Sequence, residues 1–306
     1  MNLKPVLVDI DPKTMNLDIS HLKKVLDNDD NIKGIMAVHI LGMCTNMEEL
    51  MKIVKEKNLF LIEDTCESLG TTYKNKKLGT FGDFGTYSFY YSHHITTIEG
   101  GMVVCNNKED YNILKCLRAH GWTRNLDNKD LYEKKYNSID SRFLFINMGY
   151  NLRPMEIQGR MGIIQLKKLT EKNNNRIFNH DQVINKLLND KRNNNIFSSP
   201  IPLEHTNTAW FGIVIIINKR YKKLYKKYLK YLDNNKVETR PIVSGNMAKQ
   251  PICEYFNFDF SSSDMIGADI LHETGFFIGS SCSKISDEKL NKLIEIFYNF
   301  DFSQSC

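Results

Sequence analysis

The first half of the chain alternates short apolar runs with segments of helical periodicity. Apolar runs at 5–9, 34–40 and 59–62 are separated by the segments 19–26 and 47–57, where apolar residues recur at helical spacing. Strands that alternate with helices in this way are typical of a parallel sheet with crossover helices. The next apolar runs, 84–89 and 101–105, leave no room for a helix between them. We therefore expect loops there, and we expect these loops to carry the functional site.

The second half of the chain has longer helical patterns. It is predicted to contain, in order, a helix over 154–172, a polar bend or boundary at 172–176, a helix over 178–188, a strand over 209–217, a helix rich in lysine and tyrosine from 221, and a final helix over 287–297. Proline at the first turn and apolar residues near helical spacing indicate the first of these helices. The sequence thus predicts a large domain, 1–174, and a smaller α+β domain, 175–306.

Composition and charge exclude several classes of protein. The 306 residues are 42% hydrophobic and 25% charged, which is typical of a globular protein and excludes disorder, collagen and a disulfide-dense mini-protein. The net charge of +5 comes from 41 Lys and Arg against 36 Asp and Glu. The lysines cluster at 221–227, which we interpret as the solvent side of an amphipathic helix, so we expect no nucleic-acid partner.

The cysteines and the hydropathy pattern bear on the compartment. Seven cysteines include no CxxC pair and no Cys/His ligand spacing, so we expect free thiols in a reducing cytoplasm and no metal site. The most apolar stretch, 211–217, has the length of a strand and is too short to span a membrane. No signal peptide is recognisable, so we expect neither secretion nor a membrane partner.

Generic motifs do not identify the chemistry. The glycines at 79–85 match neither GxGxxG nor a P-loop, His272 and Glu273 lack the second histidine of a zinc motif, and no GxSxG is present. More specific is the pair Glu63 and Asp64 at the carboxyl end of a predicted strand, where open α/β sheets bind ligands. Taken alone, Asp64 is better interpreted as a cap of the following helix.

Six segments occur in the order and spacing of a known family: 5–11, 38–42, 63–70, 82–101, 118–122 and 149–158. On these segments the chain resembles the DegT/DnrJ/EryC1/StrS sugar aminotransferase and dehydratase family of fold-type I enzymes, which use pyridoxal 5′-phosphate (PLP). The resemblance implies an α/β fold, with a mostly parallel sheet in the large domain. The family also carries a segment before residue 5 that contributes to the phosphate site. We expect that segment to be missing here, which leaves the large domain truncated and an apolar sheet face exposed.

One departure from the family selects a branch within it. Aminotransferase members have a lysine, which binds the cofactor covalently, two places before an Ile-Thr-Thr segment; here that residue is His93. The stretch Ser92–His94 and the stretch 238–251 are similar to the GDP-4-keto-6-deoxymannose 3-dehydratase branch. An iron–sulfur relative in this branch holds its cluster with closely spaced cysteines, which this chain lacks. The resemblance thus implies a lyase without a cluster that acts on a nucleotide-linked 4-keto-6-deoxy sugar.

The resemblance also implies the cofactor, the partners and the site. PLP would be converted to pyridoxamine 5′-phosphate (PMP) by L-glutamate, in a homodimer. Six residues are assigned by position: His93 as the proton-transferring base, Asp64 at the pyridinium nitrogen, Ser88 at the phosphate, Glu67 near the ring hydroxyl or the substrate, Asn151 reaching the partner's cofactor, and Arg240 at an anionic group of glutamate or the nucleotide. Two alternatives stay open: a sugar aminotransferase that uses another lysine, and a catalytically silent chain or subunit of a heteromer.

Overall fold

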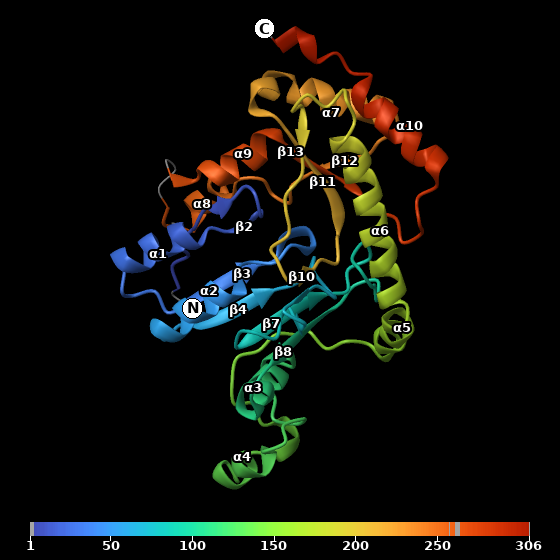
Figure 1. Cartoon of the computed structure of the whole chain (residues 1–306). Coiled ribbons are helices and arrows are strands. Elements are labelled where there is room, and N and C mark those ends of the chain that lie inside the picture. The colour runs from blue at the N-terminus through green and yellow to red at the C-terminus, as the bar shows by residue number, and fades with distance from the viewer. Residues whose placement is uncertain (1–2, 257, 261–263, 306) are drawn as a thin grey trace.

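A four-stranded sheet organises the first half of the computed structural model, which describes residues 3–256, 258–260 and 264–305 (Figure 1). Its strands, in spatial order, are β3 (Gly34–Val38), β4 (Phe60–Asp64), β7 (Phe84–Ser88) and β8 (Gly101–Cys105). The first three are parallel, and β8 runs antiparallel to β7. Four of the five strands predicted for the first half are confirmed, as is the long loop between β7 and β8.

Two helices cover one face of this sheet. α1 (Ile19–Asn28) begins at Asp18, whose carboxylate accepts the amides of residues 20 and 21, and α2 (Met47–Glu56) begins at Asn46, which caps it in the same way. Both helices bury an apolar side against the inward residues of β3 and β4. The cluster consists mainly of Leu22, Leu26, Ile35, Ala37, Met47, Leu50, Ile53, Val54 and Leu61. Their helical and alternating spacing explains why these segments form helices and strands.

The opposite face of β3 and β4 is exposed. Alternation along the strands turns Met36, Val38, Phe60 and Ile62 outward, and these side chains are 57%, 43%, 63% and 36% exposed. Parallel sheets in proteins are normally covered on both faces. This apolar face has no covering layer among the described residues.

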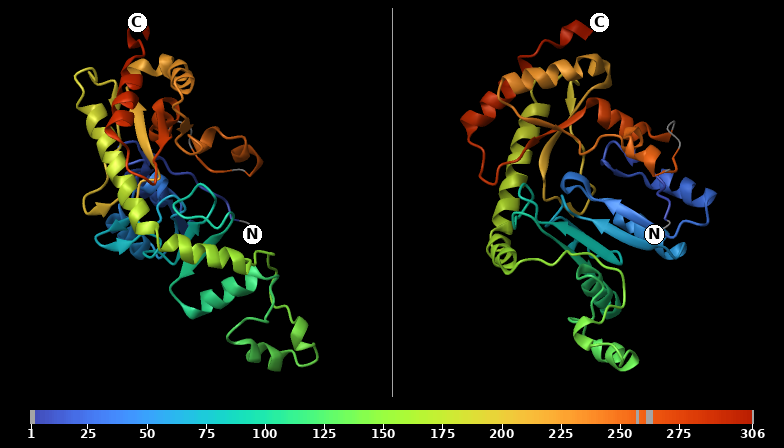
Figure 2. Two further views of the ribbon diagram at one scale, coloured as in Figure 1. Left: turned by 90° about the vertical axis from the view of Figure 1, so that its right-hand side faces the viewer. Right: turned by 180° about the vertical axis from the view of Figure 1, so that it is seen from behind.

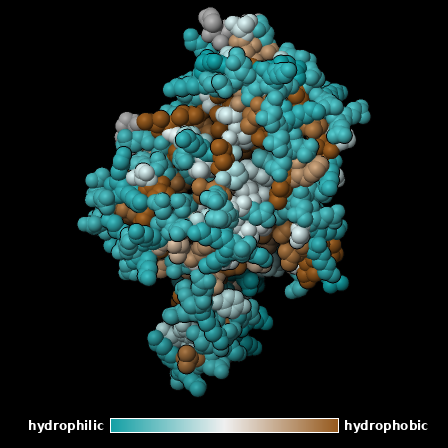
Figure 3. Space-filling model, in the orientation of Figure 1, coloured by the Kyte–Doolittle hydropathy of each residue, from teal (hydrophilic) through white to brown (hydrophobic). Residues whose placement is uncertain are grey.

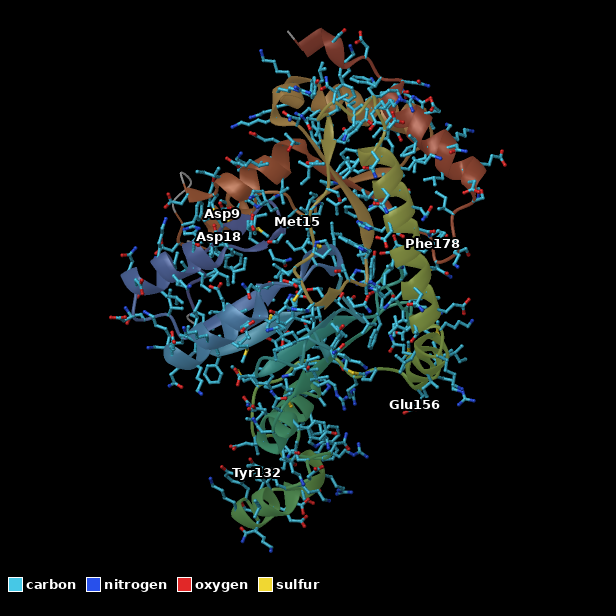
Figure 4. All side chains as sticks on the ribbon, in the orientation of Figure 1. Asp9, Met15, Asp18, Tyr132, Glu156 and Phe178 are labelled. Carbon is cyan, nitrogen blue, oxygen red and sulfur yellow. The ribbon has the colours of Figure 1, made fainter. Side chains whose placement is uncertain are left out.

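The strand predicted at 5–9 is wrong. That segment forms only a single bridge, between Val6 and Asp259. Asp9 is buried, and its carboxylate accepts the amides of Gly267 and Ala268 at the start of α9 (Ile266–Thr274). Figure 4 labels Asp9 beside this helix. The Gly267 amide that Asp9 caps lies 258 residues later in the chain, so local hydropathy could not predict this contact. The first ladder is instead β1 (Ile10–Asp11) with β2 (Asn16–Leu17).

The second half is built on an antiparallel sheet, confirming the α+β expectation. Its order is β12 (Thr239–Pro241), β13 (Gly275–Gly279), β11 (Gly212–Ile217) and β9 (Phe197–Ser198). Its core is formed with α6 (Leu169–Leu188), α7 (Tyr225–Asn234) and α10 (Asp287–Tyr298). In α7, Tyr228 and Leu232 are buried while the lysines are exposed, which confirms the amphipathic helix. A small ladder of β10 (Thr206–Asn207), β5 (Thr72–Tyr73) and β6 (Lys76–Lys77) ties the halves together.

The helix boundary predicted at 172–176 is wrong. The break falls at Lys167 and Lys168, between α5 (Glu156–Leu166) and α6, and 172–176 lies inside α6. Asn173 and Arg176, two of the polar residues that suggested a bend, are buried there. The expected domain division at 174 therefore falls within a continuous helix.

A lobe projects below the sheet. It contains α3 (Lys108–Arg118), α4 (Lys129–Lys135) and the loop that leads into α5, and it stands away from the body in every view (Figure 2). α5 buries none of its residues, and Figure 3 shows apolar atoms exposed over it. α8 (Ile252–Tyr255) is a single turn. The six cysteines that the structure describes are free thiols, and none of its described helices is long and apolar enough to cross a bilayer.

Candidate active site

Asp64 and Ser88 lie at one edge of the sheet, as expected from their places at strand ends. Asp64 is the last residue of β4 and Ser88 the last of β7, and these strands are parallel. Thr86 is the cross-strand neighbour of Asp64, so Ser88 stands two residues beyond it along the next strand. One oxygen of Asp64 accepts the Cys66 amide at 3.0 Å, and the Cys66 thiol is a further hydrogen-bond partner of this carboxylate.

His93 reaches the same edge from the loop between β7 and β8. Its Nδ1 lies 2.9 Å from the carbonyl oxygen of Cys66, which can only accept, so the imidazole carries its proton on Nδ1. Nε2 is left without a protein partner in the described chain. Burial lowers the pKa of His93 below its usual value, the contacts with Cys66 and Asp64 raise it, and the charge of Arg176 lowers it further. The neutral imidazole therefore presents a free lone pair at pH 7.

Glu67 is held in the turn that follows Asp64. Its Oε2 accepts the backbone amide of Leu41 at 3.0 Å, and Leu41 has a positive φ of 51°. Burial raises the pKa of Glu67, the Leu41 bond opposes this, and the charge of Asp64 adds to it. The carboxyl consequently takes up a proton more readily than an exposed glutamate does.

A buried pair lies beneath the site, and its carboxylate is Glu63, which the sequence had marked together with Asp64 as a candidate for ligand binding. Both side chains of His39 and Glu63 are fully buried, with His39 Nε2 at 3.3 Å from Glu63 Oε2. Glu63 also accepts the amides of Gly79, Phe81 and Gly82 at 2.8, 2.6 and 2.8 Å. Although burial raises the pKa of Glu63, the bonds from His39, Gly82 and Gly79 together hold it below its usual value. This carboxylate shapes the turn that leads into β7.

His94, next to His93 in the loop, faces away from the free end of the His93 imidazole and binds the backbone instead. It is buried, and its Nε2 donates to the carbonyl of Ala209 at 2.9 Å. Burial and the charge of Arg176 lower the pKa of His94 to about 3. The ring of Phe211 packs against His93 with centroids 5.0 Å apart and rings nearly perpendicular. Sequence reasoning missed Phe211 because nothing in the predicted strand over 209–217 marks one of its apolar residues as a neighbour of the site.

Asn151 and Arg240 do not join this group of side chains. Asn151 is exposed and forms an isolated bridge with Ala119 at the end of α3. Arg240 lies on the edge strand β12, where it pairs with Glu238 at 2.6 Å. Tyr91, beside His93 in the loop, is close enough to Arg240 to raise the pKa of its guanidinium after the larger effect of Glu238.

Comparison with known proteins places the chain among sugar-modifying enzymes. It is 38% identical over 289 residues to GDP-4-keto-6-deoxy-D-mannose 3-dehydratase of Escherichia coli O55:H7, covering 94% of this chain and 72% of that protein. The solved structure of a GDP-4-keto-6-deoxymannose-3-dehydratase mutant with bound GDP-perosamine superposes with a TM-score of 0.85 and 35% identity, covering 96% of this chain and 75% of that one.

A second solved structure contains the cofactor. It is the E. coli 3-dehydratase with bound hydrated PLP, which matches with a TM-score of 0.82 and 36% identity over 95% of this chain and 73% of that one. The model of the DegT/DnrJ/EryC1/StrS aminotransferase family matches residues 1–297. On this match and on the fold, the chain belongs to the DegT/DnrJ/EryC1/StrS aminotransferase family.

Proposed function

We propose that the chain catalyses PLP- and PMP-dependent 3-dehydration of a nucleotide-linked 4-keto-6-deoxyhexose, with GDP-4-keto-6-deoxymannose as the first candidate substrate. The observation that carries the proposal is His93. It stands where aminotransferases of this family have lysine, and its Nε2 is free while Nδ1 is bound to Cys66. No lysine occurs in the whole loop 89–100. The similarity to 3-dehydratases over more than nine-tenths of the chain supports the same reaction.

The residues at the sheet edge fit the cofactor. The carboxylate of Asp64, at the end of β4, suits a protonated ring nitrogen, since a carboxylate stabilises that cation. The hydroxyl of Ser88, which accepts the Tyr90 amide at 3.2 Å, keeps its own proton to donate to a phosphate oxygen. When bound, the cofactor supplies a conjugated ring that takes up the electrons released as a C–H bond breaks. Asp64 and Ser88 would hold its two ends.

His93 moves the proton in this proposal. The Nδ1–H bond to Cys66 fixes the tautomer, so the lone pair of Nε2 is the only basic position of the ring. Burial keeps that position unprotonated at neutral pH. Nε2 can therefore accept a proton at one step and return it at another, when the C3 hydroxyl leaves. An imidazole cannot take the place of the lysine that binds the cofactor covalently.

Glu67 and Arg240 would act on the substrates. Glu67, whose pKa is raised by burial, can donate a proton in a hydrogen bond to an oxygen of the cofactor ring or the sugar. Arg240 is exposed beside Tyr91, and a carboxylate of glutamate or a phosphate of the nucleotide would compete with Glu238 for its guanidinium. These roles make Arg240 a binding residue and Glu67 a residue that orients the reacting group.

A homodimer would bring Asn151 to the site. Asn151 is exposed and is followed by α5, which presents Ile157, Ile163 and Ile164 to solvent. An apolar patch of this kind marks an interface. Ala119, the bridge partner of Asn151, also lines a cavity of about 310 Å³ with Lys115, Trp122, Arg124, Asn125 and Arg153. Its three cations suit the diphosphate of a substrate bound between two subunits.

Two further proposals concern the cellular location and the division of the chain into two units. The free thiols fit a cytoplasmic location. We also retain the division into a cofactor-binding unit, 1–174, and a smaller unit, 175–306, with α6 shared between them.

The test is a single incubation with product analysis. The purified chain is mixed with PLP, L-glutamate and GDP-4-keto-6-deoxymannose. Dehydration yields a 3-deoxy sugar with one 2-oxoglutarate and one ammonia for each sugar converted. An amino sugar without ammonia would instead indicate an aminotransferase, and the absence of any sugar product would indicate a silent chain. Either of these outcomes contradicts the proposal.

A further inference from the structure

Three consecutive backbone carbonyls beside the site are held by two buried side chains. His94 donates to Ala209 O at 2.9 Å, and Arg176 Nη1 donates to Phe211 O at 2.8 Å and, more weakly, to Trp210 O at 3.5 Å. The segment 209–211 leads into β11, and its amides are bound as well: Ala209 N donates to Thr71 Oγ1 and Phe211 N to Leu41 O. This segment is therefore fixed from both sides.

The fixed segment determines where the Phe211 ring lies. The ring contacts His93 at 5.0 Å and His94 at 5.7 Å between centroids. Leu41, which accepts the Phe211 amide, donates its own amide to Glu67. Phe211 thus contacts His93, the proposed base, through its ring. Through the backbone of Leu41 it is also linked to Glu67, the proposed proton donor.

Arg176 is unusual in its surroundings. Its side chain comes from the middle of α6, is only 7% exposed, and has no carboxylate within ion-pair distance among the residues that the structure describes. Its Nε is buried without a partner as well. A buried cation that is bound only by carbonyls costs stability, because the carbonyls replace water incompletely. A neutral side chain would fill this place at lower cost, so a role in the site explains the arginine better than stability does.

We propose that Arg176 is a positioning residue of the active site, which fixes the Phe211 ring against His93 and adds an uncompensated positive charge close to the imidazole. The groups around His93 support this. Asp64 on β4 is the one anion that acts on it, and Arg176 on α6 is the opposing cation. The Cys66 thiol has its pKa raised to about 12 by burial and by Asp64, so it is neutral at pH 7. Tyr90 and Phe211 contact the imidazole through their rings.

The test is the titration of His93 by NMR with histidine labelled in ¹⁵N; the His93→Asn variant identifies the signal. Arg176→Met removes the charge and the carbonyl contacts, and Arg176→Lys keeps a charge. We expect Arg176→Met to raise the His93 midpoint by roughly 0.5 to 1 pH unit. At pH values below the His93 midpoint, only the neutral imidazole is active, and its fraction falls as the midpoint rises. At these pH values kcat/KM should therefore fall by about threefold to tenfold. Arg176→Lys should keep the midpoint near that of the unchanged chain.

Asn179→Ala is the matched control. Asn179 is buried on the same helix and also donates to backbone carbonyls, those of Ser281 and Ser283, but has no contact with His93 or Phe211. It should lower stability and leave the His93 midpoint unchanged. If Arg176→Met leaves the midpoint unchanged, or if Asn179→Ala shifts it equally, Arg176 is purely structural and the inference is wrong.

A second variant covers the case in which Arg176→Met does not fold. Phe211→Leu keeps both polar side chains and removes the ring, so the midpoint should rise because His93 loses part of its burial; an unchanged midpoint overturns the inference. The inference rests on the proposed role of His93, but the NMR titration reports on the imidazole whether or not substrate turns over. The experiment can therefore contradict the role of Arg176 without contradicting the proposed function, and the reverse is also possible.

Discussion

Replacing Glu63 by glutamine should destabilise the protein strongly, although the two side chains have nearly the same shape. Oε1 of Glu63 accepts the amides of Phe81 and Gly82, and Oε2 accepts the Gly79 amide and His39 Nε2–H. His39 carries its proton on Nε2 because its Nδ1 accepts the Thr45 amide. A glutamine can keep one accepting oxygen, but its NH₂ group would meet two donors.

The expected loss follows from these two broken bonds. A hydrogen bond to a charged group contributes about 1.5–3 kcal/mol, so two of them amount to about 3–6 kcal/mol of unfolding free energy. Urea unfolding at pH 7, followed by circular dichroism, measures this loss. The control is Glu48→Gln, which breaks an exposed ion pair with Lys74 and should leave the unfolding midpoint unchanged within error. A loss for Glu63→Gln below about 1 kcal/mol would refute the reasoning.

The pH dependence gives an independent check of the same carboxylate. The pKa of Glu63 is lower in the folded chain than in the unfolded chain. Its contribution is therefore fully present above the unfolded value of about 4.3 and is lost as the pH falls through the folded value. The difference in stability between the unchanged chain and Glu63→Gln should be largest at neutral pH and should shrink in acid. A difference that stays constant down to pH 3 would contradict the assignment.

Three further predictions concern the cofactor and the assembly. His93→Asn should lower kcat by about 10²–10⁴-fold and leave PLP binding unchanged, as measured by absorbance; loss of binding would make His93 structural. Borohydride treatment with PLP should leave no phosphopyridoxyl group on a lysine near 88–101, as checked by mass spectrometry, because the loop 89–100 contains no lysine. Ile164→Glu on exposed α5 should give monomers by light scattering, whereas the control Lys226→Glu on the solvent side of α7 should leave the dimer intact. If the unchanged chain is already monomeric, the placement of Asn151 at the partner's cofactor is wrong.

The strands and the core of the site could be predicted because their signals are local. Alternation along β3 and β4 marks the sheet, and the carboxylate and hydroxyl at the ends of β4 and β7 follow from it. The place of His93 came from the family pattern around it. These features depend on residues close together in sequence.

The asparagines of α6 show why other features could not be predicted. Asn is a poor helix former, so the stretch 172–176 indicated a bend. In the fold, Asn173 donates to Leu69 O and Asn175 to Cys282 O, each about a hundred residues away along the chain. These bonds compensate for the low helix propensity, and they exist only after the chain has folded. The role of Arg176 was hidden for the same reason.

The continuity of α6 restricts how the two halves can move. The helix binds the loop after β4 through Asn173, and it ends with Val183 and Leu187 in the core of the second sheet. A hinge therefore cannot lie at 172–176, and the carbonyls of 209–211 are too firmly bound to serve as one. A displacement of the second sheet is therefore transmitted directly to the loop below His93. The break in the helical path lies outside this connection, at Lys167 and Lys168, and α5 on its far side is itself bound to the His93 loop, because Gln158 donates to Glu99 O at 2.7 Å. Relative movement of the halves must therefore pass through the site.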